Sequence, residues 1–105
     1  MVFEKLRSEM VQKYVVEAGI QDERVIAAMA KVPRHLFVDP AIRHKAYLGS
    51  SLPIGFEQTI SHPTTVALMS SLLEIQPEDK VLEVGMGSGY QAAVLAEIVF
   101  RVYTI

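Results

Sequence analysis

Apolar positions recur at helical spacing over the first third of the chain. Between residues 3 and 18 they lie three and four residues apart, which predicts one amphipathic helix that ends at Gly19. Asp22 stands where the N-cap of a second helix is expected, and Pro33 ends that helix. The apolar faces consist of Phe3, Leu6, Met10, Val11, Tyr14 and Val15 in the first helix, and of Val25, Ile26 and Met29 in the second.

The middle of the chain shows no such periodicity. Residues 34–40 mix apolar and turn residues and are predicted to run over the surface, followed by a helical turn at residues 41–45. Residues 47–63 are rich in glycine, serine and proline, which predicts a long irregular segment. Because long loops in compact domains often carry function, this segment is a candidate for binding or catalysis.

The last third alternates between strand and helix patterns. Apolar residues at positions 66, 69 and 73 predict a helix from Pro63 to about Glu74. Residues 81–84 read as a short buried strand, residues 85–89 as a glycine-rich loop, residues 90–100 as an apolar helix and residues 102–105 as a second strand. This order is that of a βαβ unit, so the predicted fold class is α/β.

Composition narrows the classes of protein and partner. The chain of 105 residues suits one domain, which the patterns divide into a segment of helices and irregular chain at 1–61 and a segment at 62–105 that contains the start of the βαβ unit. A net charge of −2 without a basic run argues against nucleic acid. The absence of cysteine excludes thiolate chemistry and suits the cytoplasm. No apolar run approaches the roughly 20 residues that span a bilayer, and the scattered histidines predict no metal site.

The glycine-rich loop carries the first chemical signal. In a βαβ unit this loop lies at the carboxyl edge of the sheet, where a ligand can approach the bare backbone of glycine. The spacing of Gly85, Gly87 and Gly89 is one residue shorter than in a dinucleotide-binding loop. Together with Glu83, it resembles motif I of the Rossmann-like methyltransferases, which bind S-adenosylmethionine. The alternative is a glycine-rich turn without a ligand.

Four segments together resemble one family. They are Val-Pro-Arg-His-Leu-Phe-Val at 32–38, Leu-Pro-Ile-Gly at 52–55, Gln-Thr-Ile-Ser at 58–61, and residues 81–96, which include the glycine loop. In this order and spacing they are similar to protein-L-isoaspartate O-methyltransferase. The resemblance implies an incomplete Rossmann-like fold and an enzyme that transfers a methyl group from S-adenosylmethionine to the free α-carboxylate of L-isoaspartyl residues in damaged proteins, leaving S-adenosylhomocysteine. The methyl ester then collapses to a succinimide.

The resemblance also implies roles for particular residues. Ser61 would lie beside the transferring methyl group and hydrogen-bond the acceptor carboxylate, although a serine here also suits the N-cap of the following helix. Because a carboxylate with a pKa of about 4 is ionised at pH 7, no general base is needed. For Arg34 and Tyr47 we expect packing or surface roles, with a contact to the substrate as the alternative. The implied cofactor-binding residues are Gln58, Thr59, Ile60, Ser61, Glu83, Gly85, Gly87, Ser88 and Gly89.

The sequence departs from the family pattern in two places. Glu57 stands where many members have glycine, and residues 49–51 replace a stretch in which an acidic residue is common. In the wider superfamily an acidic residue after the second strand binds the ribose, and it is expected just beyond Ile105. We therefore expect this chain alone to have little or no activity, to expose apolar surface and to self-associate.

Other classes of function remain open at this point. The first is another S-adenosylmethionine-dependent methyltransferase that acts on a small molecule. The second is a non-catalytic, truncated module that binds the cofactor or self-associates. The loop spacing disfavours a nicotinamide-dependent dehydrogenase.

Overall fold

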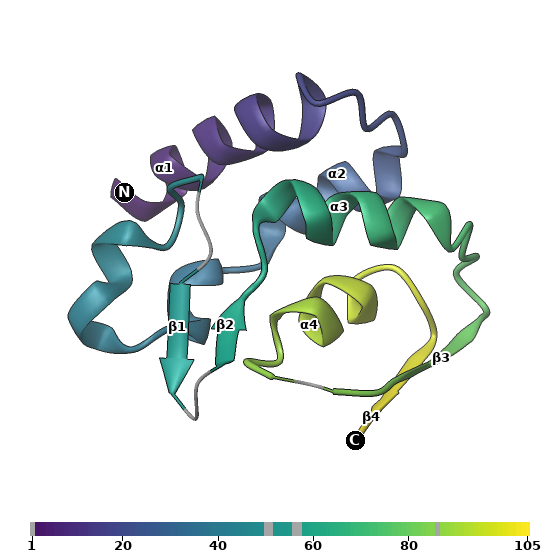
Figure 1. Ribbon diagram of the computed structural model, residues 1–105. Coiled ribbons are helices and arrows are strands. Elements are labelled where there is room, and N and C mark those ends of the chain that lie inside the picture. The colour runs from purple at the N-terminus through teal and green to yellow at the C-terminus, as the bar shows by residue number, and fades with distance from the viewer. Residues whose placement is uncertain (1, 50–51, 56–57, 86) are drawn as a thin grey trace.

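The computed structural model describes residues 2–49, 52–55, 58–85 and 87–105, with only the backbone of 52–55 and 58–59. Figure 1 shows a chain of short helices with the N-terminus on one side and a small sheet beside the C-terminus on the other. The helical elements are α1 (Val2–Val11), η1 (Gln12–Val16), α2 (Glu23–Lys31), η2 (Arg34–Phe37), η3 (Pro40–Lys45), α3 (Pro63–Leu72) and α4 (Tyr90–Ala96). The strands are β1 (Leu52–Gly55), β2 (Gln58–Ile60), β3 (Lys80–Glu83) and β4 (Arg101–Thr104).

The βαβ unit predicted from the last third of the chain is confirmed. Strands β3 and β4 pair in parallel, with Val81 opposite Val102 and Leu82 opposite Tyr103, and α4 connects them. Since successive side chains of a strand point to opposite faces, the two pairs lie on different faces of the sheet. Val81 and Val102 pack against the helical core, whereas Leu82 and Tyr103 are exposed. Helix α4 is shorter than predicted and ends at Ala96.

The first predicted helix is present but changes type along its length. After α1, residues Gln12–Val16 form a π-helix, in which the amide of Glu17 donates to the carbonyl of Gln12 at 3.0 Å. The hydroxyl of Thr64 donates to the carbonyl of Tyr14 at 2.6 Å, so a contact from α3 holds this wide turn. Gly19, with a φ of 98°, follows as the expected stop.

The predicted cap of the second helix is confirmed. The Asp22 side chain accepts hydrogen bonds from the amides of Arg24 at 3.0 Å and Val25 at 3.4 Å. On the face that the spacing predicted, Val25 and Met29 are fully buried. Lys31 at the end of α2 reaches Glu97 after α4 at 3.0 Å, an exposed ion pair that contributes little to stability.

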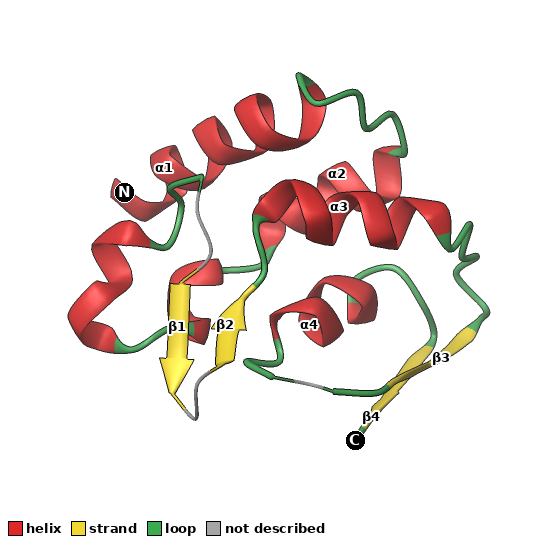
Figure 2. Cartoon of the chain, in the orientation of Figure 1, coloured by secondary structure: helices red, strands yellow, loops and turns green. Residues whose placement is uncertain are grey.

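Two predictions for the middle of the chain are wrong. The segment expected to be irregular contains an antiparallel hairpin of β1 and β2, which Figure 2 shows apart from the parallel sheet. Its register shifts between Pro53 and Gly55, so the residues that suggested a loop instead produce an irregular strand pair. The prediction that residues 34–40 run over the surface is wrong for Arg34 and Val38, which are buried, although Leu36, Asp39 and Pro40 are exposed as predicted.

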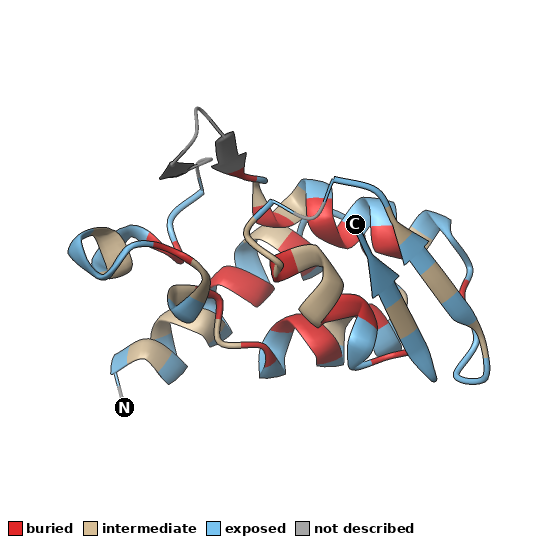
Figure 3. Cartoon of the chain, turned by 90° about the horizontal axis from the view of Figure 1, so that it is seen from below, coloured by how far each residue is buried: buried red, intermediate tan, exposed pale blue. Residues whose placement is uncertain are grey.

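The core lies between the helices and the inner face of the parallel sheet. Its most deeply buried side chains come from α1, the π-helix, α2, η2, α3 and α4. Figure 3 shows the buried segments in red, most of them on helices. Helix α3 begins at Pro63 as predicted and ends at Leu72, two residues early, before Glu74 takes a φ of 50°. This packing brings the start of α3 and the start of α4 to the same region of the molecule (Figure 1).

Candidate functional site

A cavity of about 410 Å³ lies where the segment before α3 meets β3 and the glycine loop. Ile60 and Ser61 line it from one side, and Gly85, Gly87 and Ser88 line it from the other. Two segments that the sequence singled out separately therefore meet at one cavity. Its volume falls within the range of roughly 300–1,000 Å³ that small-molecule sites occupy.

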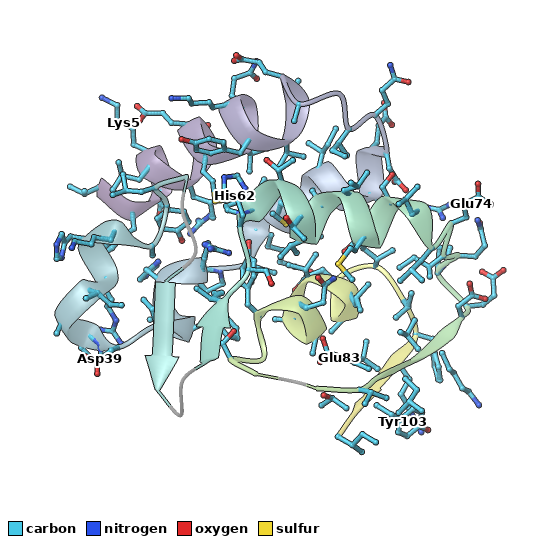
Figure 4. All side chains as sticks on the ribbon, viewed as in Figure 1. Lys5, Asp39, His62, Glu74, Glu83 and Tyr103 are labelled. Atoms are coloured by element: carbon cyan, nitrogen blue, oxygen red, sulfur yellow. The ribbon has the colours of Figure 1, made fainter. Side chains whose placement is uncertain are left out.

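Ser61 lies between the end of β2 and the start of α3, and its side chain is exposed. It does not cap the helix, as one interpretation of the sequence expected. The cap is His62, labelled in Figure 4, whose Nδ1 accepts a hydrogen bond from the amide of Thr64 at 3.0 Å. Within the described part of the chain the Ser61 hydroxyl makes no hydrogen bond, so it is free to bind a ligand.

The glycine loop is built from left-handed backbone. Gly85, Gly87 and Gly89 have φ values of 83°, 57° and 86°, a region that side chains other than glycine rarely adopt. A Cβ at Gly85 would meet nothing within 4 Å, so conformation rather than crowding requires glycine there. The amide of Gly85 donates to the carbonyl of Ile105 at 2.9 Å, which fixes the loop to the end of β4.

Glu83 ends β3 and lines the same cavity, half-buried on the inner side of the sheet. The hydroxyl of Thr104 donates to Glu83 Oε1 at 2.9 Å, across the register that pairs these residues. The contact orients the carboxylate and leaves its other oxygen able to accept a hydrogen bond from a ligand.

Sequence reasoning missed the apolar walls of the cavity. Val66 and Met69 of α3 line it together with Leu73, the C-cap of α3, and these are the residues whose spacing predicted the helix. Met69 is 58% exposed and Leu73 is 53% exposed, which is unusual for a helix face that reads as core. A signal was therefore present, but the spacing alone does not distinguish a core face from a cavity wall.

Helix α4 supplies the floor through Tyr90 and Gln91. The Gln91 side-chain amide donates to the Ser70 hydroxyl at 2.7 Å and so joins α4 to α3. Burial raises the pKa of Tyr90 to about 12, although the neighbouring Arg34 guanidinium opposes this effect. Tyr90 is therefore a neutral packing residue at pH 7 and not an acid or base.

Some predicted residues cannot be placed fully. Gln58 and Thr59 lie on β2, opposite Gly55 and Pro53, but their side chains are outside the described part. Glu57, one of the two departures from the family pattern, also lies outside the described residues.

Among the described residues, no group of three or more histidine, aspartate or glutamate side chains is arranged to hold a metal ion. In the same part of the chain, no helix is both long enough and apolar enough to cross a membrane.

Comparison with known proteins identifies the family. The sequence model described as Protein-L-isoaspartate(D-aspartate) O-methyltransferase (PCMT) matches residues 5–105, nearly the whole chain. The chain belongs to this family. The protein-L-isoaspartate O-methyltransferase 1 of Syntrophobacter fumaroxidans is 56% identical over 103 residues, which cover 98% of this chain and 48% of that protein. The Salinibacter ruber member is 60% identical over 89 residues, 85% of this chain and 39% of that protein.

Solved structures of protein-L-isoaspartate O-methyltransferases share the fold. One aligns with a TM-score of 0.73 at 25% identity and covers 92% of this chain and 33% of its own. A putative member from Plasmodium falciparum, solved in complex with S-adenosyl-L-homocysteine, aligns with a TM-score of 0.69 at 24% identity and covers 86% of this chain and 40% of its own. The α/β, Rossmann-like class is thus confirmed in incomplete form, and the chain spans about half the length of the curated relatives it matches.

Proposed function

We propose that the cavity binds S-adenosylmethionine and that this chain carries the donor-binding part of a methyltransferase. The acceptor class is the α-carboxylate of L-isoaspartyl residues in damaged proteins and peptides. The supporting observation is that Ser61 and the glycine loop line one cavity. A hydroxyl suits an acceptor carboxylate, and bare backbone suits close approach of a donor.

The residues present fit the proposed cofactor. Gly85 and Gly87 line the cavity with backbone that has no Cβ, and apolar side chains from α3 line it as well. Gly89 is not among the lining residues and shapes the loop through its left-handed backbone. Glu83 adds one carboxylate whose direction Thr104 fixes. Such a mainly apolar cavity with few polar groups is typical of a cofactor site.

Each predicted residue takes a role in this proposal. The backbone of Gly85, Gly87, Ser88 and Gly89 holds the donor, with Glu83 accepting a hydrogen bond from it. Ile60 walls the cavity. Gln58 and Thr59, which precede Ile60 on β2, are proposed as further cofactor-binding residues. When bound, S-adenosylmethionine supplies an activated methyl group on its sulfonium.

Ser61 needs only to orient the acceptor. Its hydroxyl donates a hydrogen bond to one carboxylate oxygen and leaves the other available for reaction. Because the carboxylate is already ionised at pH 7, the site requires no base. The apolar walls exclude water from the anion, which favours displacement in a fixed line.

The names of the relatives agree with this proposal. Syntrophobacter and Salinibacter proteins at 56% and 60% identity carry the name protein-L-isoaspartate O-methyltransferase. S-adenosyl-L-homocysteine, which the Plasmodium falciparum structure contains, is what remains of the donor after transfer. The cysteine-free composition suits the cytoplasm, and this localisation stays a prediction.

We further propose that this chain alone has little turnover and self-associates. Its outer sheet face exposes Leu82, Val84, Tyr103 and Ile105 at 48–75%. Apolar side chains gathered on one exposed face favour association. A methyl-transfer assay on an isoaspartyl peptide tests the first part, since turnover near that of a relative of full length contradicts it.

Calorimetry tests the binding proposal directly. Titration of the chain with S-adenosylhomocysteine is expected to give saturable heat at one site. No heat would favour the reading of a non-catalytic structural module. An isoaspartyl peptide added to the saturated chain should then bind, and Ser61→Ala should weaken this step.

The control for the acceptor step is Ser8→Ala, which removes an exposed hydroxyl from α1. It should leave peptide binding unchanged. If S-adenosylhomocysteine binds but the isoaspartyl peptide binds no better than its aspartyl counterpart, a methyltransferase for small molecules replaces the present proposal.

A further inference from the structure

Arg34 is the most deeply buried charged side chain of the described residues. It lies in η2, and its exposed fraction is 0%. Its described neighbours are carbonyl oxygens and a tyrosine ring rather than a carboxylate. Burial of a cation without an opposite charge costs free energy, and here burial lowers the pKa of the guanidinium from its usual value. Such a residue needs an explanation beyond core packing.

One side of the guanidinium contacts the part of the cavity wall that Ile60 and Ser61 form, here called the Ser61 wall. Nη2 donates to the carbonyl of Ser61 at 2.9 Å, and Nε donates to the carbonyl of Ala46 at 2.7 Å. Bonds from a charged donor are about twice as strong as neutral ones. The backbone of Ser61 is therefore tied through Arg34 to the end of η3, although the Ser61 side chain itself stays exposed.

The face of the same guanidinium packs on Tyr90, which belongs to the part of the cavity wall formed by Gly85, Gly87, Ser88 and Tyr90, here called the glycine-loop wall. Its central carbon lies 4.8 Å from the centroid of the Tyr90 ring, in a cation–π arrangement. Tyr90 follows Gly89 directly, and its amide donates to the Ser88 hydroxyl at 3.2 Å. Phe37, from the same short helix as Arg34, packs edge-on against Tyr90 with ring centroids 5.7 Å apart.

We propose that Arg34 is a positioning residue that fixes the Ser61 wall and the glycine-loop wall relative to one another. This inference rests on the proposed function, because the spacing of the two walls matters only if donor and acceptor meet between them. A lysine cannot replace Arg34, since a compact ammonium lacks the planar fork that binds two carbonyls while stacking on a ring. Nη1 is buried without a hydrogen-bond partner in the described structure, and this unmet donor adds to the cost of burying Arg34.

The test compares Arg34→Lys with Arg7→Lys. Arg7 also ties distant segments, since its Nε donates to the carbonyl of Ala30 at 2.8 Å, but it touches neither wall. Hydrogen exchange of the free chain is measured over residues 60–64 and 88–92. Arg34→Lys is expected to speed exchange in both segments together, and Arg7→Lys in neither.

Binding of S-adenosylhomocysteine provides the functional readout. Arg34→Lys is expected to weaken its affinity about tenfold, and Arg7→Lys to leave it unchanged even if thermal stability falls equally. Faster exchange in one segment only, or an unchanged affinity, would overturn the positioning role. If the wild-type chain does not bind the ligand, the proposed function fails, and the exchange result still decides whether one side chain holds both walls.

A second measurement covers the case in which Arg34→Lys does not fold. The Nε–H signal of Arg34 in the wild-type chain is followed by nuclear magnetic resonance during the titration. A shift that saturates with the ligand supports the role, because the bonds of Arg34 adjust as the walls take up their ligand. A signal that stays constant while the ligand binds overturns it.

Discussion

The two faces of the β3–β4 sheet differ in what covers them. On the inner face, Val81 and Val102 pack against the helices. On the outer face, Leu82 is 63% exposed and Tyr103 is 48% exposed. Figure 4 shows Tyr103 at the edge of the molecule, away from α4. Apolar residues on both faces are typical of a parallel sheet that is covered on both sides, so the sequence of these strands suits more packing than the described residues supply.

This difference has a consequence for the cavity. Ser61, Glu83 and the glycine loop line one cavity together with residues of α3 and α4, so the proposed donor site is assembled from segments that are distant in the sequence. Leu82 and Val84 of the outer face are also among the residues that line the cavity. Stability should therefore depend mainly on the inner face, whereas substitutions on the outer face should act mainly on association.

The largest expected contrast is between a core residue and an outer-face residue. Met29→Ala should destabilise the chain by about 2–5 kcal/mol, because a fully buried side chain leaves a cavity. Leu82→Ala should change stability by no more than about 0.5 kcal/mol. Urea unfolding followed by circular dichroism measures both. Equal losses would show that the outer face is packed in solution.

A smaller effect is expected from the glycine loop. Gly85→Ala forces a side chain into left-handed backbone and should cost about 1–2 kcal/mol. Gly19→Ala is the matched control, since Gly19 also has positive φ and open space around it but lies far along the chain from the cavity. Both variants should lose similar stability, and only Gly85→Ala should weaken binding of S-adenosylhomocysteine. Equal affinity of both variants for S-adenosylhomocysteine would show that the glycine loop does not contribute to binding the donor.

Association should respond to charge on the outer face. Leu82→Glu places a carboxylate among exposed apolar side chains and is expected to shift the chain toward monomer. Leu36→Glu changes a side chain of similar exposure, 57% against 63%, on η2. Sedimentation velocity at several concentrations compares the two. If both variants dissociate the chain to the same extent, general charge rather than the outer face controls association.

The smallest expected effect is a pH dependence from His35. Burial first, and then the charges of Arg7 and Arg43, lower the pKa of His35 below 6.5, while the ring stacks on Phe3 and bonds to the Tyr47 hydroxyl. The unfolded chain then binds a proton more readily, so stability falls as pH drops below about 6.5 toward the lowered value. Thermal unfolding between pH 7 and pH 5 should show a shallower loss in His35→Gln. If the stability of His35→Gln falls with pH as steeply as that of the unsubstituted chain, titratable groups other than His35 cause the loss.

Local patterns predicted the elements that local physics governs. The N-cap at Asp22, the stop at Gly19 and the order of β3, loop, α4 and β4 each depend on neighbours in sequence. The π-helix was not predictable in this way, because it depends on a contact between distant segments: the hydroxyl of Thr64 on α3 donates to the carbonyl of Tyr14. The hairpin was hidden by proline and glycine within its own strands.

The residues of the candidate site also fall into two groups, those that the sequence indicated and those that only the fold brings together. The glycines at 85, 87 and 89 stood out by residue type and spacing, and Ser61 stood out through the resemblance to the family. The burial of Arg34 did not, since its partners at Ala46, Ser61 and Tyr90 come from three other segments. Sequence reasoning assigned Arg34 a packing or surface role, and only the fold shows that it connects the two walls. Contacts between distant segments are the information that a single sequence lacks.

The central claim is that one ligand contacts Ser61 and the glycine loop at the same time. The most direct test is an amide-resolved nuclear magnetic resonance titration of the chain with S-adenosylhomocysteine. The account predicts that the amides of Ser61, Gly85 and Ser88 shift with one common dissociation constant. Shifts confined to one of these segments, or absent from both at saturating ligand, would contradict it.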